Sequence, residues 1–217
     1  FAAYQPLRMV ADVATREAIA AAESAADLEF LWADLPQLVQ ESQDGVTRIR
    51  DIVLSLRNFS RLDESAQKDA DINEGLRSTL RIVRPLCQNR IEIKEAYGDL
   101  PVIWCHPGQL NQVFLNVLIN AVQAIPDSGT IWVSTALQAD QVVVCLRDSG
   151  EGMDAQTLAR LGEPFFTTKP VGAGTGLGLA ISFGIMERHR GRLRYESQPG
   201  QGTTVFIEIP AQRRRSV

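Results

Sequence analysis

Residues 148–179 read DSGEGMDAQTLARLGEPFFTTKPVGAGTGLGL, and this stretch decides the fold. It follows an apolar run at 141–146 that predicts a strand ending in Asp148. A carboxylate at a strand end is an acceptor for a hydrogen bond from a base amine. Gly150 and Gly152 carry no side chain that would block a flat ring, and they permit positive φ angles. The first part of the stretch therefore predicts a base-binding position.

The second part of the stretch contains Gly174, Gly176 and Gly178, directly before a helix predicted over 177–189. Free N–H groups and the positive end of the dipole make a helix start suitable for phosphates. The loop between the clusters, 162–176, is long, and long loops in compact domains are functional lids or are disordered. One glycine-rich turn is a weak signal. A base position, a phosphate position and a loop between them together predict a nucleotide site.

Residues 107–125 predict an amphipathic helix on which Asn116 and Asn120 lie on the same face, four residues apart. Buried amides need hydrogen-bond partners, and their carbonyl oxygens are hard ligands that suit Mg²⁺. For the two asparagines alone, internal hydrogen bonds and metal binding are both open. The glycine clusters downstream favour the metal.

The chain from residue 67 onward alternates helices and strands. Helices are predicted over 72–86, 107–125 and 177–189, and strands over 91–97, 102–105, 130–136, 141–147, 192–197 and 203–209. We expect an α+β fold, a two-layer α/β sandwich with a mixed or antiparallel sheet on one side and helices on the other.

The first 66 residues predict a different architecture. Residues 1–24 are rich in alanine and favour a helix. A second helix carries a heptad seam at Leu35, Val39, Ser42, Val46, Ile49, Val53 and Leu56. The two helices would form an antiparallel hairpin. We expect its apolar seam to form a dimeric bundle, with packing on the following domain as the alternative, and we expect domains at 1–66 and 67–217.

Composition limits the classes of partner. The net charge of −4 gives no support to nucleic-acid binding. Three scattered cysteines suit a reducing compartment, and no run approaches the length of a membrane span, so no membrane contact is expected of this segment. Because the sequence opens at Phe1 inside a helical pattern, we expect a cytoplasmic piece of a longer protein. A membrane-bound parent stays open.

Five motifs in this order resemble those of sensor histidine kinases, over residues 69–210. QVFLNVLINA at 112–121 resembles the N box, DSGEG at 148–152 the G1 box, EPFFTTK at 163–169 the F box, GTGLG at 174–178 the G2 box, and GQGTT at 200–204 the G3 element. The resemblance implies an ATP-binding catalytic domain of the GHKL superfamily. It also implies that the hairpin is part of a dimerisation and phosphotransfer region.

The resemblance also implies residue roles. Asp148 would bind the adenine amino group, with Gly150 and Gly152 making room for the ring and Thr203 and Thr204 assisting. Asn120 would ligate Mg²⁺, with Asn116 contacting metal or phosphate. Lys169 would neutralise the terminal phosphate, so Asn116 and Lys169 are the expected catalytic residues. The loop and helix start that would close over the phosphates comprise Gly174, Thr175, Gly176, Leu177 and Gly178.

The family's activity implies partners. ATP would donate its γ-phosphoryl group to a histidine, and the group would pass to an aspartate of a response-regulator receiver domain. The chain would form a homodimer through the hairpin.

Two departures from the family pattern matter. Many members carry a basic residue three positions after the metal-binding asparagine, and here that residue is Gln123. No histidine is followed by an acidic residue early in the first helix. His106 lacks an acidic neighbour, and His189 closes a helix, where interaction with the dipole explains it. The phosphoacceptor is therefore expected outside this sequence.

Two other functions stay open. The chain could be an ATPase of the same superfamily, but those hydrolases use a glutamate one turn before the metal-binding asparagine, where this chain has Asn116. It could also be a non-catalytic dimerisation or phosphatase-type module that keeps ATP as a structural ligand. The intact glycine clusters argue against that second alternative.

Overall fold

The computed structural model describes residues 12–18, 30, 33–43, 45–46, 66–169 and 174–211. The chain divides into two compact units, Phe1–Arg50 and Asp51–Val217. Residues 51–65 lie outside the described residues, so the domain boundary expected after residue 66 stays a prediction.

The N-terminal unit is helical at 13–18, 33–43 and 45–46, as expected for those positions. The seam residues Leu35, Val39 and Val46 are exposed to solvent. Most of the first predicted helix, and the seam residues Ile49, Val53 and Leu56, lie outside the described residues. The antiparallel pairing of the two helices therefore stays a prediction.

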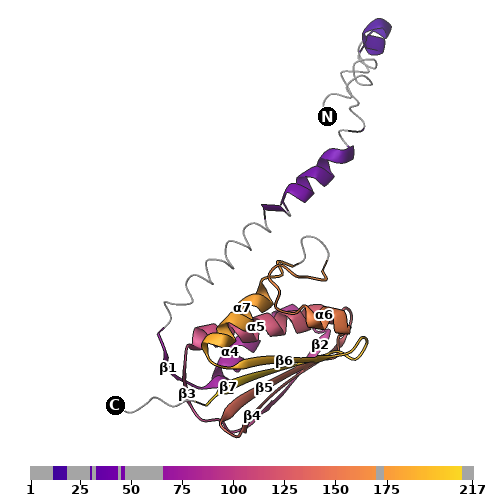
Figure 1. Ribbon diagram of the computed structural model, residues 1–217. Helices are drawn as coiled ribbons and strands as arrows, with labels where there is room; N and C mark the ends of the chain where they lie inside the picture. The colour runs from indigo at the N-terminus through magenta and orange to yellow at the C-terminus, as the bar shows by residue number, and fades with distance from the viewer. Residues whose placement is uncertain are drawn as a thin grey trace. The chain divides into compact units, whose positions relative to one another are not determined.

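The second unit contains a five-stranded mixed sheet (Figure 1). Its strand order is β2 (Ile91–Tyr97), β4 (Gly129–Gln138), β5 (Gln141–Asp148), β7 (Thr203–Pro210) and β6 (Arg192–Ser197). The β2–β4 pair is parallel and the other pairs are antiparallel. In this register Asp148 lies opposite Ile131, at the last pair between β4 and β5.

A layer of helices covers one face of this sheet (Figure 1). The layer consists of α4 (Ile72–Val83), α5 (Pro107–Ala124) and α7 (Gly178–Arg188), with the short α6 (Ala155–Ala159) beside them. Asp71 caps α4 by accepting from the N–H groups of Asn73 and Glu74, and Pro107 begins α5 at a position where no N–H is needed. The predicted two-layer α/β sandwich is confirmed.

The core lies between the two layers. Val142, Val144 and Leu146 of β5 are buried, and Phe114 and Leu118 of α5 are fully buried in the same core. Because side chains alternate along a strand, Asp148 faces the helix layer, on the same side as Val144 and Leu146. The alternation therefore turns a carboxylate toward an apolar layer.

A short strand was not expected. Lys68–Ala70 (β1) pairs antiparallel with Ile103–Cys105 (β3), and Asp69 lies opposite Trp104. The sequence predicts only a domain boundary near these residues, because exposed polar residues give no alternating pattern. The strand exists through its tertiary pairing. Helix α4 ends at Val83 and continues as the 3₁₀ helix Arg84–Cys87 (η2). Pro85 has no N–H to donate to the Arg81 carbonyl, so the α-helical hydrogen bonding cannot continue through this residue.

None of the described helices has both the length and the apolar character that crossing a bilayer requires.

Candidate functional site

Asp148 is the most deeply buried acidic side chain among the described residues, with 4% of its surface exposed. Its Oδ1 accepts hydrogen bonds from the backbone N–H of Gly150 at 2.8 Å and of Thr203 at 3.2 Å. Burial raises the pKa of this carboxyl group, and the two N–H donors only partly oppose the rise. No described residue donates to Oδ2, so this oxygen is available to an outside donor.

Three glycines around Asp148 are required by the protein's own packing. A Cβ at Gly150 would lie 2.4 Å from the carbonyl oxygen of Ala124, at the end of α5. Gly152 and Gly202 have φ angles of +68° and +79°, and a Cβ on either would lie 2.0 Å from a backbone carbonyl oxygen. For Gly202 that oxygen belongs to Asp148. Close packing of the backbone around the Asp148 carboxylate therefore requires glycine at these positions. This requirement is additional to the room for a flat ring that the sequence suggested.

The two threonines expected near the base are separated by the sheet. Thr203 is buried, and its Oγ1 forms a hydrogen bond of 2.9 Å with Ser197 Oγ, in which either hydroxyl group can be the donor. Thr204 lies opposite Arg147 in the register, so its side chain is on the other face from Asp148. The structure brings Asp148 and Thr203 together and leaves the Thr204 side chain apart.

Ser197 is part of this end of the site, although no sequence motif marks it. Its Oγ accepts from the N–H of Met153 at 2.8 Å and donates to the carbonyl of Gly202 at 3.0 Å. It thereby ties the loop after Asp148 to the turn before β7. A lone serine ahead of a glycine turn gives no signal in the sequence.

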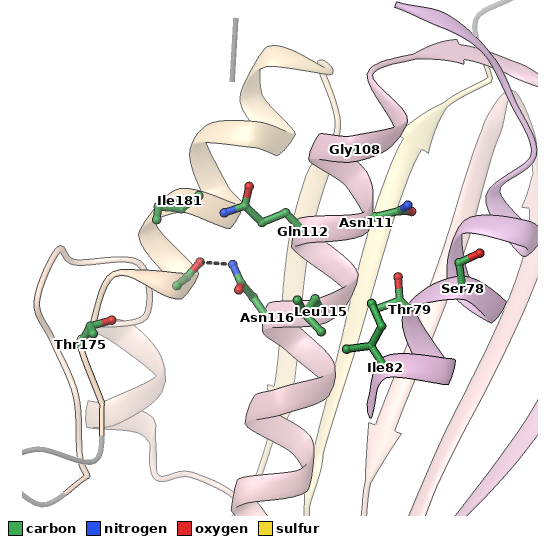
Figure 2. Close-up of a pocket in the computed structure, with 11 residues that line it drawn as sticks. Ser78, Thr79, Ile82, Gly108, Asn111, Gln112, Leu115, Asn116, Thr175 and Ile181 are labelled. Atoms are coloured by element: carbon green, nitrogen blue, oxygen red, sulfur yellow. Dashed lines mark hydrogen bonds between the residues drawn. The ribbon is translucent and has the colours of Figure 1, made fainter. Parts of the chain in front are cut away.

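Asn116 joins α5 to the start of α7. Its Nδ2 donates to the carbonyl oxygen of Gly178 at 2.9 Å, a bond that is drawn as a dashed line from Asn116 in Figure 2. The same Nδ2 donates to Ser182 Oγ at 3.1 Å. The amide donors therefore make internal hydrogen bonds, one of the two possibilities left open above. The Oδ1 atom of Asn116 accepts from no described residue.

Asn120 lies one turn further along α5, where the loop after α6 reaches the helix. Its Oδ1 accepts from Lys169 Nζ at 3.3 Å, and the same ammonium donates to Gln123 Oε1. Burial lowers the pKa of Lys169. The Oδ1 atom of Asn120 is an amide oxygen, a type of ligand that Mg²⁺ takes, and in this structure it pairs with the Lys169 ammonium.

The second glycine cluster continues from this loop into α7. Leu177 is buried, and its N–H donates to Thr175 Oγ1 at 3.4 Å, directly before α7 begins at Gly178. Gly176 has a φ of +65°, and its carbonyl accepts from Phe165 N at 3.0 Å. A Cβ at Gly174 would lie 3.0 Å from a Thr167 oxygen. Residues 170–173 lie outside the described residues.

A groove of about 490 Å³ opens beside Asn116, between α4, α5 and α7. Gln112 and Asn116 point toward α7, and Asn111 points toward α4 (Figure 2). The remaining lining residues are Ser78, Thr79, Ile82, Gly108, Leu115, Thr175, Gly178 and Ile181. The groove is uncharged, and neither Asp148 nor Lys169 lines it.

Helix α5 sets the distance between the Asp148 end of the site and the start of α7. Gly150 packs on Ala124 at its C-terminal end, and Asn116 contacts Gly178 two turns earlier. Eight residues of α-helix span about 12 Å. The arrangement offers a buried carboxylate at one end, a cation and amide oxygens in the middle, and a helix start at the other end. Within residues 66–169 and 174–211, no group of three or more His, Cys, Asp or Glu side chains is placed to hold a metal.

The two histidines lie at helix ends: His106 precedes α5, and His189 follows α7. The Nε2 atom of His189 accepts from the backbone N–H of His106 at 3.2 Å. Its Nδ1 lies 2.8 Å from the carbonyl oxygen of Ile185. Since both ring nitrogens of His189 have backbone partners, His189 has a structural role in linking the end of α7 to the start of α5.

The sequence of this chain matches a known family. Residues 105–213 match the model of the "Histidine kinase-, DNA gyrase B-, and HSP90-like ATPase" family. The match covers half of the chain and includes every residue to which the sequence analysis gave a site role.

Curated relatives and solved structures agree with this match. The chain is 37% identical to sporulation kinase E of Bacillus subtilis over 186 residues, which are 85% of this chain and 22% of that protein. It is 34% identical to the sensor histidine kinase ZraS of Escherichia coli, over 80% of this chain and 37% of that protein.

The structure of full-length ShkA in complex with AMPPNP superposes with a TM-score of 0.68 and 29% identity, over 80% of this chain and 37% of that one. The mycobacterial sensor histidine kinase MprB gives a TM-score of 0.59 at 27% identity, over 68% of this chain and 99% of that one. The chain thus spans less than two-fifths of the length of either curated relative.

Proposed function

The chain belongs to the family of histidine kinase-, DNA gyrase B- and HSP90-like ATPases, and on this premise we propose that it is the ATP-binding catalytic portion of a sensor histidine kinase. The observation that carries the proposal is the buried carboxylate of Asp148. One of its oxygens is held by two backbone N–H groups, and its other oxygen has no donor among the described residues. The oxygen without a donor can accept a hydrogen bond from a ligand, and the amino group of adenine is a matching donor.

The phosphates would extend along α5 from the base toward α7. Lys169 would neutralise charge on them, and Asn116 and Asn120 would contact phosphate or metal. Asn120 would hold Mg²⁺, which would supply positive charge shared with phosphate oxygens. The segment Gly174–Gly178 would bring backbone N–H groups at the start of α7 toward the phosphates. Thr203 would assist at the base, and Thr204 would act only from the far face of the sheet.

The reaction would be transfer of the γ-phosphoryl group to a histidine nitrogen, with ADP leaving. The chain's own residues would align the phosphate and stabilise its charge, which is most of what phosphoryl transfer requires. The uncharged groove beside Asn116 is a surface against which a segment bearing the acceptor could pack. The phosphoryl group would then pass to an aspartate of a receiver domain.

The longer protein to which we assign this chain would be cytoplasmic in this part and homodimeric through the N-terminal helices. The exposed seam residues Leu35, Val39 and Val46 support the dimer, because an apolar seam needs a covering partner.

Titration calorimetry with ATP and ADP, with and without Mg²⁺, tests nucleotide binding. We expect binding by the chain and about 10- to 100-fold weaker binding of ATP by Asp148→Asn. Transfer is tested by supplying a separate helical acceptor domain with its histidine and following phosphohistidine. Binding without transfer would favour the non-catalytic module, and steady release of phosphate without an acceptor would favour the ATPase.

A further inference from the structure

The contact between Lys169 and Gln123 joins a loop to the helix at the centre of the site. Lys169 Nζ donates to Gln123 Oε1 and, at 3.3 Å, to Asn120 Oδ1. Positions 120 and 123 are three residues apart, so their side chains are neighbours on one face of α5. The Lys169 side chain therefore bridges two adjacent amides on this face, although 46 residues of sequence separate it from Gln123.

Helix α5 has no charge of its own. Its sequence, PGQLNQVFLNVLINAVQA, contains no acidic, basic or histidine residue. A polyphosphate lying along such a helix needs positive charge from elsewhere, because buried or half-buried phosphate charge is unfavourable without compensation. Lys169 brings an ammonium to Asn120 on this face of the helix. The Arg90 guanidinium also reaches α5, but it contacts the backbone carbonyl groups of Val122 and Ile125 at the end of the helix.

Among the described residues, the partners of the Lys169 ammonium are the neutral amides of Asn120 and Gln123. Neutral oxygens orient an ammonium without neutralising it. A carboxylate at position 123 would instead neutralise the Lys169 ammonium, and the ammonium would then attract a phosphate group less strongly. Glutamine is therefore suited to holding a lysine in place while leaving its charge available.

We propose that Gln123 and Lys169 together form the cation position of the phosphate site, with Lys169 supplying the charge and Gln123 acting as its positioning residue. The proposal rests on the nucleotide-binding function proposed above. Because the charge sits beside residue 123 of α5, a lysine at residue 123 can take over the role of Lys169. The geometry thus predicts that the charge is transferable between loop and helix.

The test measures binding of AMP, ADP and ATP to four variants. Lys169→Met removes the charge and keeps the length of the side chain, and we expect at least a tenfold loss of affinity for ATP, with affinity for AMP nearly unchanged. Gln123→Met should cause a smaller loss with the same preference for the longer nucleotides. The double variant Lys169→Met/Gln123→Lys should recover most of the ATP affinity. Lys94→Met, at an exposed lysine of β2 paired with Glu92, changes net charge equally and should have no effect.

The outcomes separate this inference from the proposed function. Equal losses for AMP and ATP in Lys169→Met would mean that the contact only holds the loop, and an unchanged ATP affinity would mean that Lys169 is a solvent-facing loop residue. Failure of the double variant, with circular dichroism and thermal unfolding like those of the unaltered chain, would also overturn the inference. If the unaltered chain bound none of the three nucleotides, the proposed function itself would fail.

Discussion

Burial of Asp148 disfavours the charged form of its carboxyl group. The side chain is buried, and desolvation raises its pKa although Gly150 and Thr203 donate to it. The folded state therefore binds a proton more readily than the unfolded state, whose carboxyl group titrates near 3.8. It follows that this group lowers the free energy of unfolding as the pH rises from about 3.8 through the raised pKa.

Asp148→Asn should therefore stabilise the protein without ligand. Asparagine keeps an oxygen for the two N–H donors and carries no charge. We expect a higher Tm at pH 7, a difference that shrinks as the pH falls toward 3.8, and about 10- to 100-fold weaker ATP binding, corresponding to loss of a charged hydrogen bond of roughly 1.5–3 kcal/mol. Thermal unfolding between pH 4 and 8 and calorimetry check this. A lower Tm at pH 7 would contradict it.

His189 should produce a pH dependence of the opposite sign. Burial lowers its pKa from 6.5, the His106 ring lowers it further, and the hydrogen bond to the Ile185 carbonyl opposes these effects. Between the lowered pKa and 6.5 the unfolded state binds more protons. The contribution to stability is thus present above 6.5 and is lost as the pH falls below it.

The variant His189→Gln tests this. Glutamine offers an acceptor for the His106 N–H and a donor for the Ile185 carbonyl, but it does not titrate. Urea unfolding at several pH values should show a smaller loss of stability below pH 6.5 in the variant than in the unaltered chain. Identical slopes would mean that another group causes the acid sensitivity.

For single residues, the sequence predicts site roles where a residue lies in a specific motif. Asp148, Asn120 and Lys169 are of this kind. The sequence does not indicate Ser182 or Ser197, because a single hydroxyl in a helix or before a turn belongs to no pattern. The contact between Lys169 and Gln123 could not be predicted either, since it depends on the path of a loop back to a helix.

Among the elements, the strands agree with prediction most closely. The ranges predicted for β2 and β6 are the observed ones. Strand β4 is three residues longer than predicted, and β5 is one residue longer. Alternating burial specifies these strands locally. By contrast, β1 is short and polar and exists only through its pairing with β3, which no local pattern reports.

Three glycines with different surroundings should respond differently to alanine. At Gly202 a Cβ would meet the Asp148 carbonyl oxygen at 2.0 Å with φ at +79°, so Gly202→Ala should destabilise by more than about 2 kcal/mol. Gly184 lies inside α7 with no atom within 4 Å of the added Cβ, so Gly184→Ala should stabilise by about 0.5–1 kcal/mol. Gly200→Ala, with φ at +74° in open space, should cost about 1–2 kcal/mol. Chemical denaturation orders the three, and a neutral Gly202→Ala would refute the packing argument.

For the whole molecule, the N-terminal seam determines the predicted assembly. Val39 is exposed at a seam position, so a glutamate there would place a charge in the proposed dimer interface. We expect the unaltered chain to have about twice the mass of 23.9 kDa in light-scattering chromatography, and Val39→Glu to shift it toward the single-chain mass. Gln43→Glu, also exposed on this helix but off the seam, is the control. If the unaltered chain is a monomer, the seam is not a homodimer interface, and another partner would have to cover it.

The backbone contacts around Asp148 have a consequence for large-scale mutagenesis. Side chains at 150, 152 and 202 would collide with main-chain atoms, so substitutions there should remove the protein from cells irrespective of any ligand. Substitutions at Asp148 and Lys169 should leave abundance intact or increase it. A library scored once for abundance and once for nucleotide capture would therefore divide one motif into two classes, and the residues that fail only the second score are those that recognise the ligand.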